Sequence, residues 1–305
     1  MQNLELVNFQ TSDDVSFKAE ELLFTGNTCL VFNSTPVITA TSNSSISIHF
    51  DVPVTFNNGA TITAFNSDGI GILFSKPLLV SGGYFSVDPA RGSNGIEFRD
   101  SITFTNCSAR IRAIYGMVSD EYMDNSNEVF GVKVLGNIVI SGSDITILAS
   151  TDSSTGNIAR DLGIQMEDMT LTCDHSCEFT LDSSGQLVRE IRGVSLISVH
   201  VEGDFDTFKI NFGDPTVLIH SQSAPIVGVE IDNCHLRTSN VSVALRTMTQ
   251  GSITGVRIAN QVELENTRIS SNIMAINSSA SITGIIFAVS TSCTGGKLDH
   301  GRIKP

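Results

Sequence analysis

Short segments with apolar residues two positions apart recur along the chain at a fixed interval. The interval is 24 residues, and the first set of such segments gives two columns: Ile48, Ile72 and Ile96, and Phe50, Phe74 and Phe98. Alternation with a period of two places these side chains on one face of a β-strand. The pattern therefore predicts short strands, with equivalent residues repeated from one unit to the next.

Two further sets keep the same step within each unit. The second set is Leu30, Val54, Leu78 and Ile102 with Phe32, Phe56, Val80 and Phe104. The third and looser set pairs Ile38 with Ala40, Ile62 with Ala64, Phe85 with Val87, and Ile111 with Ala113. Turn-forming residues such as Pro53, Pro77, Asn58 and Gly82 separate the sets. Each unit of 24 residues thus holds three strands.

A strand with only two inward residues cannot bury its face alone, but stacked copies enclose a continuous core. The sequence therefore predicts an all-β protein, a right-handed single-stranded parallel β-helix (β-solenoid) with three short strands per coil. About 10–11 coils spaced about 4.8 Å apart would form a rod of roughly 50 Å. A sandwich needs hairpin turns and gives no reason for a register of 24 residues.

In the second half the period loosens, while a glycine followed by valine or isoleucine persists. These glycines, 32, 30, 35, 27 and 29 residues apart, are Gly131, Gly163, Gly193, Gly228, Gly255 and Gly284. We expect one domain over residues 1–305, with regular coils over 29–116 and looser coils over 117–305. The surplus residues predict loops that protrude from the coils, namely 119–128, 149–158 and 181–185.

Composition excludes several classes of function. Of the residues, 41% are hydrophobic and 16% charged, and the formal net charge is −14. Such a charge repels phosphate backbones and anionic lipids, so we expect no nucleic-acid partner. We also expect no direct membrane insertion, because no run of 18 apolar residues occurs. The N-terminus has neither the basic nor the apolar region of a signal peptide, so the chain is interpreted as a processed or excised segment, or one exported by another route.

The segment LLFTGNTC resembles the Phe-x-x-Asn repeats of polymorphic outer-membrane proteins, which are autotransporters of intracellular bacteria. Phe24 and Asn27 carry this resemblance, whereas Phe104 and Asn106 in ITFTNCSA are one residue closer together. The Gly-Gly-Ala motif of that family is missing, and SGGYF is the nearest segment. The resemblance to such passenger domains implies an extracellular or cell-surface location and an adhesin role, and it supplies no catalytic residue.

Other parallel β-helices, such as pectate lyases, polygalacturonases and phage tailspikes, cleave or bind carbohydrates. They use paired carboxylates, or calcium with a basic residue. In VEGDFDTF, Glu202, Asp204 and Asp206 lie two apart and are candidate calcium ligands if they share a face; the alternative is a solvated turn. The chain has no Trp and three Tyr, which argues against the stacking platforms of a sugar-binding cleft.

Two further motifs have plain structural interpretations. CDHSC (173–177) offers two Cys and one His, fewer ligands than zinc requires, so we expect either a loop closed by a disulfide or two Cys in turns. His49 lies between the inward residues Ile48 and Phe50, so it should face solvent.

The leading hypothesis is a non-enzymatic structural or adhesive rod that contacts a protein or glycan on a surface, with no catalytic residue. One alternative is a carbohydrate-active β-helix, that is, a polysaccharide lyase, a glycoside hydrolase or a tailspike-like protein. Another is a filament or surface-layer subunit that self-associates by stacking coil ends, because unpaired edge strands are templates for further pairing. No cofactor is expected apart from the calcium considered above.

Overall fold

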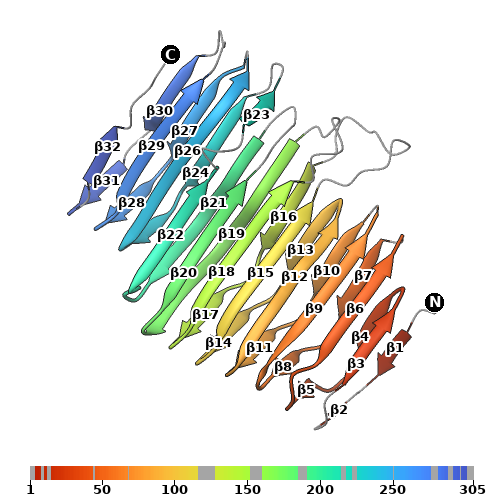
Figure 1. Ribbon diagram of the computed structural model, residues 1–305. Coiled ribbons are helices and arrows are strands. Elements are labelled where there is room, and N and C mark those ends of the chain that lie inside the picture. The colour runs from red at the N-terminus through yellow and green to blue at the C-terminus, as the bar shows by residue number, and fades with distance from the viewer. Residues whose placement is uncertain are drawn as a thin grey trace.

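The computed structural model describes residues 4–7, 10–11, 15–43, 45–67, 69–115, 128–151, 160–184, 191–213, 218–221, 225–249, 251–275, 281–287, 291–295 and 297–300. Within these ranges the chain forms strands and no helix, which confirms the all-β class. Accordingly, none of the described residues belongs to a helix that could cross a bilayer. The strands lie side by side along an elongated molecule, and the chain advances from one end to the other (Figure 1).

All strand pairings between described residues are parallel, and the strands form a 20-stranded and a 12-stranded sheet. The larger sheet contains two runs of successive pairings. Its first ladder consists of β1 (Leu4–Val7), β4 (Leu22–Thr25), β7 (Ile46–Phe50), β10 (Ile70–Phe74), β13 (Asn94–Phe98), β16 (Glu128–Val134), β19 (Arg160–His175), β21 (Ile191–Glu202), β24 (Ile226–Asp232), β27 (Ile253–Ala259) and β30 (Ile282–Phe287).

The second ladder joins the first because β19 and β21 are long enough to pair in both. Besides the C-terminal parts of those two strands, it contains β2 (Gln10–Thr11), β5 (Leu30–Phe32), β8 (Val54–Phe56), β11 (Leu78–Ser81), β14 (Ile102–Thr105), β17 (Ile138–Ser141), β25 (His235–Arg237), β28 (Val262–Glu265) and β31 (Thr291–Thr294).

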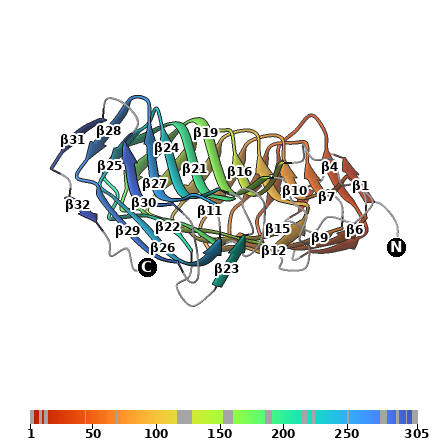
Figure 2. The same cartoon turned by 90° about the horizontal axis from the view of Figure 1, so that it is seen from above.

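The smaller sheet forms the opposite side of the molecule, as the view in Figure 2 shows. Its strands are β3 (Ser16–Ala19), β6 (Val37–Ser42), β9 (Gly59–Asn66), β12 (Tyr84–Gly92), β15 (Ser108–Tyr115), β18 (Asp144–Thr151), β20 (Glu178–Ser184), β22 (Thr207–Phe212), β26 (Ser239–Thr249), β29 (Arg268–Ala275) and β32 (Lys297–His300), with β23 (Leu218–Ser221) paired to β26. Long parallel sheets stacked in this way fit a β-solenoid.

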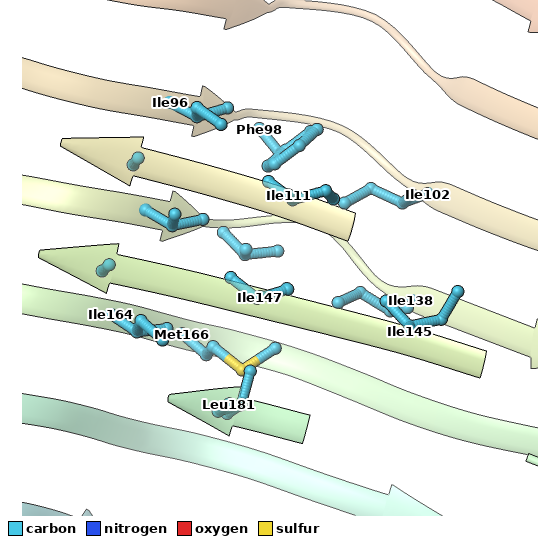
Figure 3. Packing of buried hydrophobic residues seen from close by; sticks show 14 of the residues in the cluster. Ile96, Phe98, Ile102, Ile111, Ile138, Ile145, Ile147, Ile164, Met166 and Leu181 are labelled. Carbon is cyan, nitrogen blue, oxygen red and sulfur yellow. The ribbon is translucent and has the colours of Figure 1, made fainter. Parts of the chain in front are cut away.

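The registers confirm the first two predicted sets of columns. Ile72 pairs with both Ile48 and Ile96, and Phe74 pairs with Phe50 and Phe98. In the second ladder Leu78 pairs with Val54 and Ile102. Because equivalent residues are stacked directly on one another, their side chains fill the space between the sheets, as the rows of isoleucines in Figure 3 show. Phe56 and Phe104 are buried in this core, as expected.

The third set was wrong by two residues at β12. Phe85 pairs with Ala60 and Ala109, while Val87 takes the place opposite Ile62 and Ile111. The register then shifts between Val87 and Ala90, because β12 contains an irregularity there that its neighbours lack. An extra residue of this kind restores the alignment of the following alanines.

The predicted loops are corrected in part. Residues 181–184 belong to β20, and Leu181 is fully buried in the core (Figure 3). Likewise 149–151 belong to β18, where Ala149 is buried. Their Ser and Thr content suggested loops, but alternate residues of these strands face the core. The predicted loop segments 119–127 and 152–158, and residue 185, lie outside the described residues.

Candidate functional site

A row of polar side chains follows the outward face of the first ladder. Each occupies the position between two core residues of its strand, and successive members pair in register. We call this the outer row, which consists of Glu97, Lys133, Gln165, Ser195, Glu230 and Arg257. Four of its members are less than 9% exposed although they lie outside the core: Glu97, Gln165, Ser195 and Glu230. The outer face of this ladder therefore carries polar side chains that are buried.

The two carboxylates of the outer row are neutralised by arginines. Arg99 donates to both oxygens of Glu97, at 2.9 and 3.1 Å, and this hydrogen bonding raises the pKa of Arg99. Arg192 donates to Glu230 at 2.7 Å, and Arg257 lies 3.5 Å from the other carboxylate oxygen. Such paired geometry is what buried charges require. The Glu97 pair is local, since Arg99 lies two residues after it in the chain, whereas Glu230 links its strand β24 to both neighbours, β21 and β27.

Gln165 is the one member of the outer row with an unpaired buried atom. Its Nε2 donates to Glu167 at 2.5 Å, whereas its Oε1 is buried without a hydrogen-bond partner in the protein. An unpaired buried acceptor is costly, so this oxygen favours any donor that reaches it.

Apolar side chains flank the outer row. Phe130 pairs with Leu162 in the neighbouring strand, and both are buried although neither belongs to the core cluster. The Lys133 ammonium lies 5.8 Å from the centre of the Phe130 ring, within cation–π range. The outer face thus combines an apolar strip with paired charges.

A second polar cluster lies on the second ladder, and we call it the histidine cluster: His200, Glu202, His235, Arg237 and Glu265. His200 and His235 pair in register, and their Nδ1 atoms are 3.3 Å apart. Arg237 donates to both Glu265 oxygens, at 2.8 and 3.4 Å, and these bonds raise the pKa of Arg237. The cluster is more exposed than the outer row, with 49% of the His200 side chain accessible.

The three calcium candidates end up with different partners. Glu202 lies 3.6 Å from His200 Nε2, and Asp206 accepts a hydrogen bond from Ser176 at 2.9 Å. Asp204 contributes to raising the pKa of Arg237. Gly203, between Glu202 and Asp204, has φ of 81°, and the strand ends there. The alternation that would place all three carboxylates on one face therefore does not continue past Glu202. Among the described residues, no three His, Cys, Asp or Glu side chains are grouped to hold a metal ion.

No protein-family model matches the chain, and neither the curated proteins nor the solved structures contain a significant match.

The CDHSC motif contains a disulfide. Cys173 and Cys177 form a disulfide with Cα atoms 6.0 Å apart, which confirms the disulfide alternative for this segment. Of the other described cysteines, burial raises the pKa of the Cys234 thiol to about 11, and it also raises that of Cys107. Thiols held protonated in this way are poor nucleophiles.

The carboxylates of the outer row do not form the pair that glycoside hydrolysis requires. Glu97 on β13 and Glu230 on β24 are separated by β16, β19 and β21, so four inter-strand steps place them about 19 Å apart. Catalytic pairs are about 5–9.5 Å apart. Each carboxylate is also occupied by an arginine.

Sequence reasoning missed both polar groups, although the glycine columns carried a signal for them. Glu97 and Glu230 each follow their glycine, Gly95 and Gly228, by two residues. His200 and His235 each follow theirs, Gly193 and Gly228, by seven. Equal offsets from an aligned glycine place residues in one row, so aligning the coils would have found both groups.

Proposed function

We propose that the chain is a right-handed parallel β-helix with three strands per coil that serves as a non-enzymatic structural or adhesive rod. The observation that carries this proposal is the unbroken parallel pairing of the first ladder, in which eleven strands follow one another from β1 to β30. In both ladders of the larger sheet most strands pair with the one three places later in the chain, as β7 does with β10 and β8 with β11. The exceptions involve β19 and β21, which belong to both ladders.

The mechanism of such a rod is geometric. Parallel stacking sets outward side chains about 4.8 Å apart in straight rows, so a partner meets a fixed array rather than one pocket. On the first ladder the exposed side chains of Arg99 and Arg257, 49% and 45% accessible, supply charges of such an array, and the buried carboxylates Glu97 and Glu230 hold them in place. A surface protein or a glycan with donor and acceptor groups along its length suits this surface.

An extracellular or cell-surface location is part of the proposal. The disulfide between Cys173 and Cys177 supports it, because disulfides persist in oxidising compartments. The resemblance of the segment at Phe24 and Asn27 to autotransporter passengers points the same way.

The test compares binding with cleavage on the same material. The purified chain is applied to a panel of immobilised acidic and neutral glycans and cell-surface proteins, and product release from each polysaccharide is followed with and without calcium. Binding without release of oligosaccharides is expected. New reducing ends or unsaturated products would instead establish the carbohydrate-active alternative.

A charge-reversal variant links binding to the outer row. Arg257→Glu places a carboxylate beside Glu230 and should weaken partner binding at least tenfold, whereas Arg268→Glu on the smaller sheet serves as the matched control. Equal loss in both variants would contradict a role for the outer row. Light scattering over a range of concentrations separates the rod from the self-assembling alternative, since a filament subunit grows in mass as concentration rises.

A further inference from the structure

Two histidines on adjacent strands bring their ring nitrogens together on the outside of the second ladder. His200 on β21 and His235 on β25 are directly paired in register, with Nδ1 atoms 3.3 Å apart. Their ring centroids are 4.8 Å apart and the planes are inclined by 45°. Because 4.8 Å is the ordinary spacing of paired strands, the backbone itself holds the two rings at this separation.

The nitrogen separation matches the spacing of two ligands on one tetrahedral metal ion. Zinc–imidazole bonds of about 2.0–2.1 Å at the tetrahedral angle place the two nitrogens about 3.3 Å apart. In the absence of a metal, one neutral ring can donate its Nδ1 proton to the other. When a metal ion binds both Nδ1 atoms, the donating ring moves that proton to its own Nε2 by exchange with water, so both rings ligate as neutral imidazoles.

We propose that His200 and His235 form a binding site for a transition-metal ion of the Zn²⁺, Ni²⁺ or Cu²⁺ class, with both Nδ1 atoms as ligands. Imidazole nitrogens suit these ions, whereas calcium requires oxygen ligands. Since no third His, Cys, Asp or Glu completes a metal group among the described residues, water fills the remaining positions. The site is therefore open and its ion exchangeable.

Glu202 is placed to support His200 as a metal ligand. Its Oε1 lies 3.6 Å from His200 Nε2, the nitrogen that carries the proton once Nδ1 binds metal. A carboxylate facing that proton fixes the ring orientation and makes the imidazole a stronger ligand. The nearby guanidinium of Arg237 is already paired with Glu265, which offsets its repulsion of a cation.

The exposure of the pair permits access by an ion. The side chains of His200 and Glu202 are 49% and 54% accessible, so water and metal reach the rings from solvent. The site is separate from the outer row, which belongs to the first ladder, and does not depend on the proposed rod function.

The test is titration of the metal-free chain with ZnCl₂ by isothermal calorimetry near neutral pH, with CaCl₂ as the ion control. One zinc per chain and no calcium response at this site are expected. His200→Gln or His235→Gln should weaken zinc binding at least tenfold, and Glu202→Gln should weaken it less. The matched control is His175→Gln, which removes another exposed histidine and should leave zinc binding unchanged.

Spectroscopy of the copper-loaded chain counts the nitrogen ligands directly, and this count does not depend on the stability of the fold. Electron paramagnetic resonance should show two nitrogen ligands in the parent chain and one in either histidine variant, while circular dichroism confirms that the variants fold. Absence of zinc binding, or zinc binding that persists when both histidines are replaced, would overturn the proposal.

Discussion

At the scale of single residues, the glycines of the first ladder are required by close approach. A Cβ atom added to Gly228 would lie 2.6 Å from the carbonyl oxygen of Gly255 and 2.8 Å from Val243 Cγ1. The same approach to the glycine of the next strand recurs at Gly71, Gly95 and Gly131. The glycine column therefore marks where neighbouring strands and the core leave no room for a side chain.

We predict that Gly228→Ala lowers the free energy of unfolding by about 1–3 kcal/mol, because backbone and core must shift to admit the methyl group. Gly284→Ala is the matched control, since its added Cβ would meet nothing closer than Ser271 at 3.9 Å. Urea unfolding of both variants measures the difference. Equal changes in stability for the two variants would show that the lower backbone entropy of the unfolded chain, and not crowding in the folded protein, dominates.

A second feature at the scale of single residues is His49, which makes stability depend on pH. It lies on the outward face, as expected, but it is half-buried and its Nε2 is 2.7 Å from Ser75 Oγ. Burial lowers the pKa of His49 below its ordinary value of 6.5, an effect that Asp51 opposes and Arg99 reinforces. Its folded form therefore resists protonation more than its unfolded form.

We expect this residue to destabilise the fold on acidification. As pH falls below about 6.5 the unfolded chain takes up the proton first, so the free energy of unfolding decreases until the folded pKa is passed. His49→Asn, which cannot titrate, should flatten the slope of stability against pH in that window. Urea midpoints between pH 7.5 and 5 measure it, and an unchanged slope would refute the assignment.

At the scale of elements, aromatic stacking connects successive strands of the first ladder. The rings of Phe24, Phe50, Phe74 and Phe98 are stacked in sequence, with centroids 4.7, 4.7 and 5.0 Å apart and planes within 9°. All four are buried. One residue at this position thus contacts the strands on both sides of its own.

Phe74→Ala should cost about 3–5 kcal/mol, since it opens a cavity inside a stack that cannot close, because backbone hydrogen bonds fix the spacing between the strands. Phe74→Leu keeps most of the volume and should cost clearly less. Chemical denaturation of the two variants provides the comparison. A similar cost for both would mean that ring stacking, rather than filled volume, determines the stability of this column.

At the scale of the whole molecule, contacts link mainly neighbouring strands of each ladder. A solenoid of this kind behaves as a sum of local interfaces. We predict that Phe74→Leu on β10 and Gly228→Ala on β24 combine additively to within about 0.5 kcal/mol, because four strands separate them. Phe50→Leu combined with Phe74→Leu should deviate, since those rings are in contact. Coupling between the distant pair in denaturation experiments would contradict this local behaviour.

The sequence by itself determined the class of fold and much of its register. Columns such as Ile48–Ile72–Ile96 were readable because a stacked strand repeats the same burial at each turn, so the same residue type is required at each step. The same reasoning failed at Phe85, where an irregularity within β12 shifts the count, and at Leu181, whose polar neighbours obscured a buried strand.

Only the tertiary structure decided which polar groups meet. Glu230 and Arg192 are 38 residues apart in sequence, and His200 and His235 are 35 apart. Coil lengths vary in this half of the chain, so their contact depends on how the intervening residues are accommodated. Hydrophobic periodicity encodes which face is buried, but the pairing of outward side chains depends on register between strands, and that is fixed only when the strands stack.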